Sequence, residues 1–322
     1  MEYLPWVEKY RPTKIDDIMS HEQNINIIKK LLAKNSFPHM LFHGTPGTGK
    51  TSLIMAIASE LYGSKKNLMM MKLDASDDRG INSVREEIKG FAEKITMFNK
   101  GIKLIILDEA DSMTFEAQFA LRRIIEKYSH STRFCLICNY ENKIIPAIRS
   151  RCANFRFGPI DTISVQNKLK YICKHENITY DDEVLENISM LCKGDLRKSI
   201  NFLQSLSLQT CHITMDICYM TAGVPLICNI KILIDNLLDS SVGYDEINTL
   251  IEQYIKSNGF SLSIVLKELV SYILKNKMDD IIPSKLAIIL NDMADLENRV
   301  SKSTFGDIYM SGLIGIFKKH DS

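Results

Sequence analysis

The sequence lacks any apolar run that approaches the roughly 18 residues a helix needs to span a bilayer. Its opening residues, Met1 to Trp6, also lack the basic and apolar regions of a signal peptide. These absences argue against a membrane-embedded or secreted protein. We therefore expect the chain to act inside the cell, without a membrane partner.

The spacings typical of metal-binding cysteines are also missing. The eight cysteines are scattered, and several, such as Cys135 and Cys138, lie within apolar runs. No pair has the spacing of a zinc knuckle. A structural zinc site or a disulfide framework is therefore disfavoured, and we expect buried thiols in a reducing compartment.

Net charge is small but unevenly distributed. The chain carries a formal charge of +1, yet residues 1–160 hold 24 Lys+Arg against 18 Asp+Glu, or +6, and the remainder sums to −5. A basic front half suits a polyanion such as a nucleotide or DNA, although a split of this size can also serve only solubility. The length of 322 residues favours two or three domains.

Residues 38–158 have the pattern of an α/β domain. Short strand-like segments at 40–43, 104–107, 134–137 and 155–157 alternate with helical spacing, as at 52–62, and those at 104–107 and 134–137 are continuous apolar runs. Continuous apolar runs of this length are typical of parallel strands that are buried on both faces. The pattern predicts a parallel sheet with flanking helices.

The remainder of the chain is predicted to be helical. In 161–225, which looks wholly helical, we expect helices at 163–175, 181–191, 195–206 and 214–221, with Gly194 as a stop and Asp195 as an N-cap. In 226–322 we expect helices at 227–238, 244–256, 262–275, 285–301 and 305–317. An acidic helical region without a catalytic constellation usually serves packing or oligomerisation.

The most specific motif is a phosphate-binding loop. Residues 44–51 match the pattern G-x-x-x-x-G-K-[ST] in full, between a predicted strand and a predicted helix that continues with Ser52. The backbone of such a loop wraps phosphates, Lys50 reaches the β- and γ-phosphates, and Thr51 ligates Mg²⁺. The predicted nucleotide-binding set here is Gly44, Thr45, Pro46, Gly47, Thr48, Gly49, Lys50, Thr51 and Ser52.

Two later strand ends carry polar residues that complete a hydrolysis site. The run 104–107 ends in Asp108 and Glu109, which we assign to Mg²⁺ and to activation of the attacking water, respectively. The run 134–138 ends in Asn139, which is in a position to contact the γ-phosphate or the water. Taken alone, the acidic pair could be a surface strand end and Asn139 a turn former. The upstream loop and the order of the motifs favour the catalytic interpretation.

Further segments resemble one known family. They are 6–12 (WVEKYRP), 74–81 (DASDDRGI) with 84–85, 108–113 (DEADSM), 120–123 (ALRR), 150–152 (SRC) and 194–197 (GDLR). Together they resemble the small subunits of replication factor C, the AAA+ clamp loader of DNA replication, over about residues 5–203. Beyond that point, the resemblance is one of compatible length and helical character.

This resemblance implies a domain plan and residue roles. An α/β P-loop AAA+ module would span 1–160, a helical lid 161–225 and an all-α collar 226–322. Val7, Tyr10, Arg11 and Pro12 would border the adenine, and Arg197 would sense the ATP of its own subunit. Arg151 would act in trans, as an arginine finger on the ATP of the neighbouring subunit. Arg79 and Arg85 would lie near the DNA backbone. The alternative is that the arginines are ordinary solvated surface residues and that Trp6 and Tyr10 are ordinary core aromatics.

The same resemblance implies cofactors and partners. ATP and Mg²⁺ are expected, together with other clamp-loader subunits in a five-membered ring, a sliding clamp and primer-template DNA. The location would be the nucleus if the protein is eukaryotic, and the cytoplasm or a replication compartment if it is archaeal or viral. Residues 91–98 are a candidate clamp contact but could equally be core.

Other interpretations fit these residues less well. A DEAD-box helicase would need a second RecA-like half, which the helical residues 161–322 do not supply. A non-catalytic ring scaffold is disfavoured by intact Glu109 and Arg151. A Holliday-junction or protein-remodelling AAA+ motor is disfavoured by the WVEKYRP and SRC segments.

Overall fold

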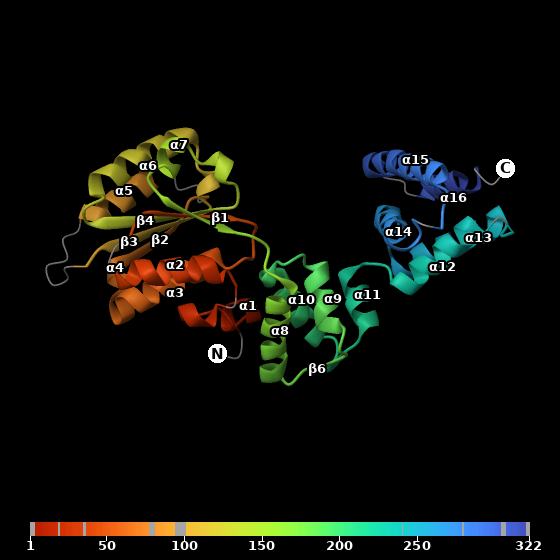
Figure 1. Ribbon diagram of the computed structural model, residues 1–322, viewed down its shortest axis with the longest axis horizontal. Coiled ribbons are helices and arrows are strands. Elements are labelled where there is room, and N and C mark those ends of the chain that lie inside the picture. The colour runs from red at the N-terminus through yellow and green to blue at the C-terminus, as the bar shows by residue number, and fades with distance from the viewer. Residues whose placement is uncertain are drawn as a thin grey trace. The chain divides into compact units, whose positions relative to one another are not determined.

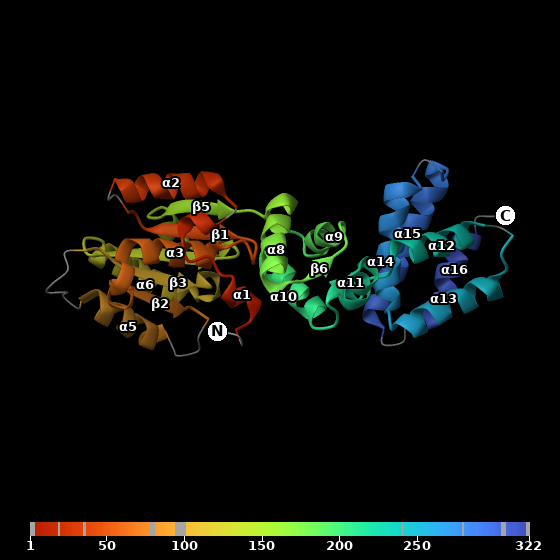
Figure 2. The same ribbon diagram turned by 90° about the horizontal axis from the view of Figure 1, so that it is seen from below.

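The computed structural model describes residues 4–18, 20–34, 37–76, 81–93, 101–239, 241–278, 280–303 and 307–319. Its contacts divide the chain into two compact units, 1–212 and 213–322, and each is described by itself (Figures 1 and 2). The three-domain plan with boundaries at 160 and 225 stays a prediction.

A five-stranded sheet lies at the centre of the first unit. Its order is β2-β3-β4-β1-β5, and every neighbouring pair is parallel. The strands are β1 (Met40–Gly44), β2 (Met70–Asp74), β3 (Lys103–Asp108), β4 (Thr132–Cys138) and β5 (Ala153–Phe157). The four predicted strand segments, at 40–43, 104–107, 134–137 and 155–157, all lie in these strands. The pattern missed β2, whose residues are only partly buried at the edge of the sheet and form no continuous apolar run.

Helices cover both faces of this sheet (Figure 1). Successive side chains of a strand point to opposite faces. Phe42 therefore packs with α2 (Glu22–Ala33) and α3 (Lys50–Tyr62), whereas Leu41 packs with α5 (Ile81–Glu93) and α6 (Phe115–Tyr128). Each fully buried side chain of this size contributes about 1.5–3 kcal/mol to stability. The shorter helices of this part are α1 (Trp6–Lys9), α4 (Lys66–Met69) and α7 (Pro146–Arg149).

Residues 161–212 complete the first unit. They form α8 (Thr162–Glu176), α9 (Val184–Leu191), α10 (Leu196–Ser207) and the short strand β6 (Thr179–Tyr180), and they end at His212, the first residue of the short strand β7 (His212–Ile213). The predicted N-cap is confirmed, because the Asp195 side chain accepts a hydrogen bond from the Lys198 N–H at 3.0 Å. Gly194 before it has a φ of 75°.

Two expectations for this region were wrong. The region is not wholly helical, because the N–H of Thr179 in β6 donates to the Cys211 carbonyl at 3.3 Å and takes the backbone out of the helical pattern. The helix predicted from residue 181 begins at Val184. Asp181 instead lies in a turn, where its carbonyl accepts from the Val184 N–H at 3.0 Å.

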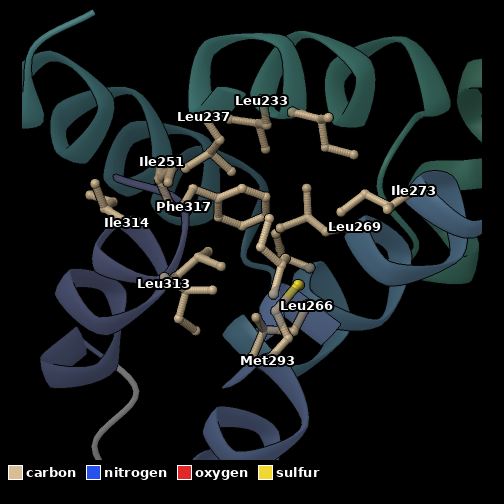
Figure 3. Packing of buried hydrophobic residues seen from close by; sticks show 14 of the residues in the cluster. Leu233, Leu237, Ile251, Leu266, Leu269, Ile273, Met293, Leu313, Ile314 and Phe317 are labelled. Carbon is tan, nitrogen blue, oxygen red and sulfur yellow. The ribbon is translucent and has the colours of Figure 1, made fainter. Parts of the chain in front are cut away.

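After Ile213, the last residue of β7, helices are the regular secondary structure in the described residues of the second unit. Its helices are α11 (Met215–Ala222), α12 (Ile227–Leu238), α13 (Tyr244–Asn258), α14 (Leu262–Asn276), α15 (Pro283–Lys302) and α16 (Met310–Lys318). Figure 3 shows the core formed by α12 to α16, to which these helices contribute Leu237, Ile251, Leu269, Met293 and Phe317, in that order. The helix predicted at 305–317 begins only at Met310, after a 3₁₀ turn at Asp307–Tyr309, and 304–306 lie outside the described residues.

Two expectations from the sequence, one about the cysteines and one about membrane-spanning helices, can be compared with this structure. All eight cysteines are present as thiols, and the prediction of buried thiols is confirmed only in part. Cys135, Cys138, Cys173 and Cys218 are buried, Cys152 and Cys192 are half-buried, and Cys211 and Cys228 are exposed. Among the described residues, no single helix is long and apolar enough to cross a membrane. The bent pair α11 and α12, at 74°, passes the same test of length and composition when taken together.

Candidate functional site

The loop between β1 and α3 has the backbone geometry of an anion cradle. Gly44, Gly47 and Gly49 have φ angles of 141°, 71° and 89°, which side chains rarely allow. A Cβ on Gly44 would lie 1.9 Å from the Phe157 carbonyl oxygen, and a Cβ on Gly47 would lie 1.7 Å from a carboxylate oxygen of Asp195. Because α3 begins at Lys50, the unpaired N–H groups of its first turn adjoin the loop.

Lys50 is held inside this loop. Its Nζ donates to the carbonyls of Gly44 at 2.7 Å and Thr45 at 2.8 Å, and to Oδ1 of Asn139 at 3.1 Å. Burial lowers the pKa of the ammonium group below its usual value. No carboxylate among the described residues lies within ion-pair distance of it. A buried cation with only neutral partners is well suited to receive an anion.

The acidic end of β3 lies beside the loop. Oδ2 of Asp108 accepts from the Thr51 hydroxyl at 3.2 Å and pairs with Lys72 Nζ at 3.1 Å. Glu109 follows with a φ of 53°, a conformation that costs a non-glycine residue about 1 kcal/mol. Strain of this kind is typical of functional positions. The sequence motifs did not predict Lys72, which comes from the unpredicted strand β2.

The end of β4 is tied to the end of β3. The carboxylate of Asp111 accepts from the backbone N–H of Asn139 at 3.2 Å and of Tyr140 at 3.1 Å. This contact fixes the turn that presents the Asn139 side chain to Lys50. Loop, β3 and β4 thus meet at the carboxyl edge of the sheet, which is where ligands bind in open parallel sheets.

These elements enclose a cavity of about 420 Å³, within the range of small-ligand pockets. Most of the residues predicted for the site line it. They are Val7, Tyr10, Arg11, Pro12, Pro46, Gly47, Thr48, Gly49, Lys50, Thr51, Ser52, Asp108, Glu109, Asn139 and Arg197. Gly44 and Thr45 are not among the lining residues, but their carbonyls accept hydrogen bonds from Lys50 Nζ.

Other lining residues were not predicted from the sequence. Asp17, Ile18, Ser20, Asp74, Ile160, Ser164, Lys168, Leu196 and Ile200 also face the cavity. Lys168 is 8% exposed, and its Nζ lies 5.2 Å from the centre of the Tyr171 ring. Burial lowers the pKa of Lys168. The sequence did contain one indication of this surface. Ser164 and Lys168 are four residues apart and therefore lie on the same face of a helix.

The remaining predicted residues lie elsewhere. Arg151 does not line the cavity; its Nη2 pairs with Glu126 Oε1 at 2.6 Å and its Nη1 donates to the Ala147 carbonyl at 2.6 Å. Arg79 lies outside the described residues, and so does the side chain of Arg85, whose backbone is in α5. Of the candidate clamp contact, Phe91 is buried in the core, and 94–98 lie outside the described residues.

Comparison with known proteins agrees with this site. Residues 40–159 match the family described as "ATPase family associated with various cellular activities (AAA)", and 167–208 match the "RCF1/5-like, AAA+ ATPase lid domain". Over 98% of its length the chain is 44% identical to "Probable replication factor C subunit 5" of Dictyostelium discoideum, covering 91% of that protein. It is 42% identical to "Replication factor C subunit 5" of Homo sapiens, with 98% and 92% covered.

The chain belongs to the replication factor C small-subunit family. It is accordingly an AAA+ ATPase with a nucleotide site and a component of a multi-subunit clamp loader of DNA replication.

A solved structure also has this fold. A variant of RuvB from Thermotoga maritima aligns with a TM-score of 0.53 over 83% of this chain and 91% of the other. Its sequence identity of 17% makes this a likeness of fold alone.

Proposed function

We propose that this subunit binds MgATP in the cavity, and that ATP binding and hydrolysis drive the opening of a sliding clamp, its loading on primer-template DNA and its release. The observation that carries the proposal is the convergence of Lys50, Thr51, Asp108, Glu109 and Asn139 around one cavity, although they come from three separate segments of the chain. Hydrolysis needs a phosphate cradle, a metal ligand and a residue that orients water, and these residue types supply all three.

The chain's own groups fit a divalent ion. The Thr51 hydroxyl and the Asp108 carboxylate lie 3.2 Å apart and are hard oxygen donors of the kind that Mg²⁺ prefers. When bound, the ion would neutralise charge on the phosphates. Lys50 would bind the β- and γ-phosphates, Glu109 would orient and polarise the attacking water, and Asn139 would contact the γ-phosphate or that water.

Hydrolysis would depend on assembly. Arg197 lines the same cavity, which supports a role on the ATP of its own subunit. Arg151 is 35% exposed and lies outside this cavity, which suits a finger that serves a neighbour in a five-membered ring. A finger of this kind accelerates phosphoryl transfer by about 10³–10⁵-fold.

The DNA contacts rest on the family resemblance. Arg79 and Arg85 would contact backbone phosphates and so hold any primer end without reading its sequence. Because the relatives named above are from eukaryotes, we expect the nucleus as the site of action.

A turnover assay tests the proposal. The chain is assembled with its native partner subunits, and ATP hydrolysis is measured with and without sliding clamp and primed DNA. We expect stimulation by both together. A ring that binds ATP but hydrolyses none under these conditions would support the alternative of a structural, non-catalytic subunit.

A further inference from the structure

Residues 6–12, which we call the N-terminal wall of the cavity, are hydrogen-bonded to lid residues that are far away in the sequence. Oε1 of Glu176, the last residue of α8, accepts from the Tyr10 hydroxyl at 2.5 Å and from Lys9 Nζ at 2.6 Å. The Trp6 N–H donates to Oε1 of Gln204 in α10 at 3.1 Å. The N-terminal helix α1 is therefore attached to both lid helices that flank it.

The contact between Tyr10 and Glu176 is supported by aromatic packing and by partial burial. The ring of Tyr10 stands edge-on to the rings of Tyr171 and His175, with centroids 6.2 and 6.4 Å away. The Glu176 side chain is only 19% exposed. Its burial alone would raise its pKa, yet the hydrogen bonds from Lys9 and Tyr10 hold the pKa below its usual value. The carboxylate thus stays charged in a largely covered position.

The lid also contacts the cavity at its other end. The backbone N–H of Leu196 donates to the Gly47 carbonyl of the phosphate loop at 3.2 Å. Tyr10 is both a ligand-facing residue and the partner of Glu176. Beyond it, Ile15 is 1% exposed and packs in the core of the sheet domain. The segment 6–12 therefore runs from the lid to the sheet domain along the cavity, to whose wall it contributes Val7 and Tyr10.

We infer that Glu176 is a positioning residue that couples the lid to the N-terminal wall, so that the lid holds Tyr10 against the base end of the nucleotide. The inference rests on the proposed function, since it takes ATP as the ligand. In the proposed site, Lys50 and the backbone of the phosphate loop would hold the triphosphate, whereas Glu176 contacts Lys9 and Tyr10. The coupling therefore acts on the base and sugar and leaves the triphosphate unaffected.

The test compares two ligands that share the phosphates. Affinities of the full-length chain for MgATP and for magnesium tripolyphosphate, which has no base, are measured by titration calorimetry. Glu176→Ala is expected to weaken ATP binding about tenfold, since a hydrogen bond to a charged group is lost, and to change tripolyphosphate binding less than about twofold. Glu176→Gln keeps an acceptor for the Tyr10 hydroxyl and is expected to fall in between.

Matched variants keep the result interpretable. Glu186→Ala removes an exposed lid carboxylate in α9 and should change neither affinity. Tyr10→Phe combined with Glu176→Ala should be no worse than Glu176→Ala alone. If Glu176→Ala does not fold, Glu176→Gln and Tyr10→Phe carry the comparison.

Three results would contradict either the coupling through Glu176 or the proposed nucleotide site on which it depends. An equal loss for both ligands means that Glu176 only supports the fold. Unchanged ATP affinity in Glu176→Ala, together with unchanged affinity in Tyr10→Phe, removes the coupling altogether. A wild-type chain that binds tripolyphosphate no more weakly than ATP would instead contradict the proposed nucleotide site, on which the coupling depends.

Discussion

The Nζ atom of Lys50 lies 3.1 Å from Oδ1 of Asn139, which joins the loop after β1 to the end of β4. Among the residues that the structure describes, Lys50 donates hydrogen bonds only to carbonyl and amide oxygens, so it can exchange these partners for phosphate oxygens without breaking an ion pair. The Asn139 side chain therefore marks where the end of the phosphate chain would lie.

Lys50→Ala should abolish tight ATP binding while the chain stays folded. Two charge-assisted contacts to phosphate are lost, which corresponds to about a hundredfold or more in affinity. Calorimetry with MgATP measures the affinity, and circular dichroism monitors the fold. Lys231→Ala, which removes an exposed lysine from α12, is the matched control. An unchanged affinity in the Lys50 variant would remove Lys50 from the site.

The sequence predicted the parts of the site that a motif or an apolar run can encode. The strands β3 and β4 were predicted because their residues are buried on both faces and so are continuously apolar. Asp108 and Asn139 followed from their positions at the ends of these strands. The edge strand β2 gave no such pattern, and with it Lys72, the partner of Asp108, was missed.

What the sequence left unpredicted depends on tertiary packing. Ser164, Lys168 and Ile200 reach the cavity only because the lid helices turn that face toward it. The bond from Tyr10 to Glu176 joins residues 166 positions apart, and no local pattern encodes a pairing of that kind. The resemblance to a known family pointed to Tyr10 but not to its partner.

Glu109→Gln should retain ATP binding and slow hydrolysis. The amide keeps the size of the side chain but cannot polarise a water molecule, so a loss of about 10²–10⁴-fold in turnover is expected with little change in affinity. Turnover is measured in the assembled ring with primed DNA. The control is Glu116→Gln, in the first turn of α6. Turnover at the wild-type rate would show that another group activates the water.

His39 should make the stability of the first unit depend on pH. Its Nδ1 accepts from the Phe134 N–H at 3.1 Å, and burial, together with the nearby Arg133 cation, lowers the pKa of His39 to about 4. The folded state therefore disfavours the charged ring. The stability present above pH about 6.5 is lost as the pH falls toward 4, with a slope of at most about 1.4 kcal/mol per pH unit.

Denaturant unfolding of wild type and His39→Asn between pH 4 and 7 measures this effect. Asn retains an acceptor near the Phe134 N–H but does not titrate, so the variant should show a smaller slope. The variant is expected to be less stable than wild type at pH 7, because the ring no longer packs on Phe134. Identical slopes in the two proteins would assign the pH dependence to other groups.

Arg79→Ala and Arg85→Ala should weaken DNA binding about equally for all sequences. Each loses one phosphate contact, so the slope of log affinity against log salt should fall by about 1 per variant. Binding of the assembled ring to labelled primed DNA is measured over a series of salt concentrations. Arg299→Ala, which removes a cation from α15, should leave the slope unchanged. Wild-type affinity and slope in both test variants would refute the proposed DNA-facing surface.

The pair of Arg151 and Glu126 suggests how the finger is held before assembly. The two groups lie 2.6 Å apart, and Glu126 also pairs with Arg122 at 3.0 Å. Since Arg151 is outside the cavity of its own chain, Arg151→Ala should leave ATP binding by that chain intact. The isolated chain, which has no neighbour, should hydrolyse ATP poorly even as wild type.

Mixing two defective chains tests whether Arg151 acts in trans. One chain carries Lys50→Ala and the other Arg151→Ala, in an assembly that allows them to be neighbours and whose composition is verified by mass spectrometry. If the finger serves the adjacent ATP, an interface that joins the intact loop of the Arg151 variant to the intact finger of the Lys50 variant is complete. Such rings should then hydrolyse ATP although neither variant does so alone. No recovery in verified mixed rings, together with strong activity of the isolated wild-type chain, would mean that Arg151 acts in cis or not at all.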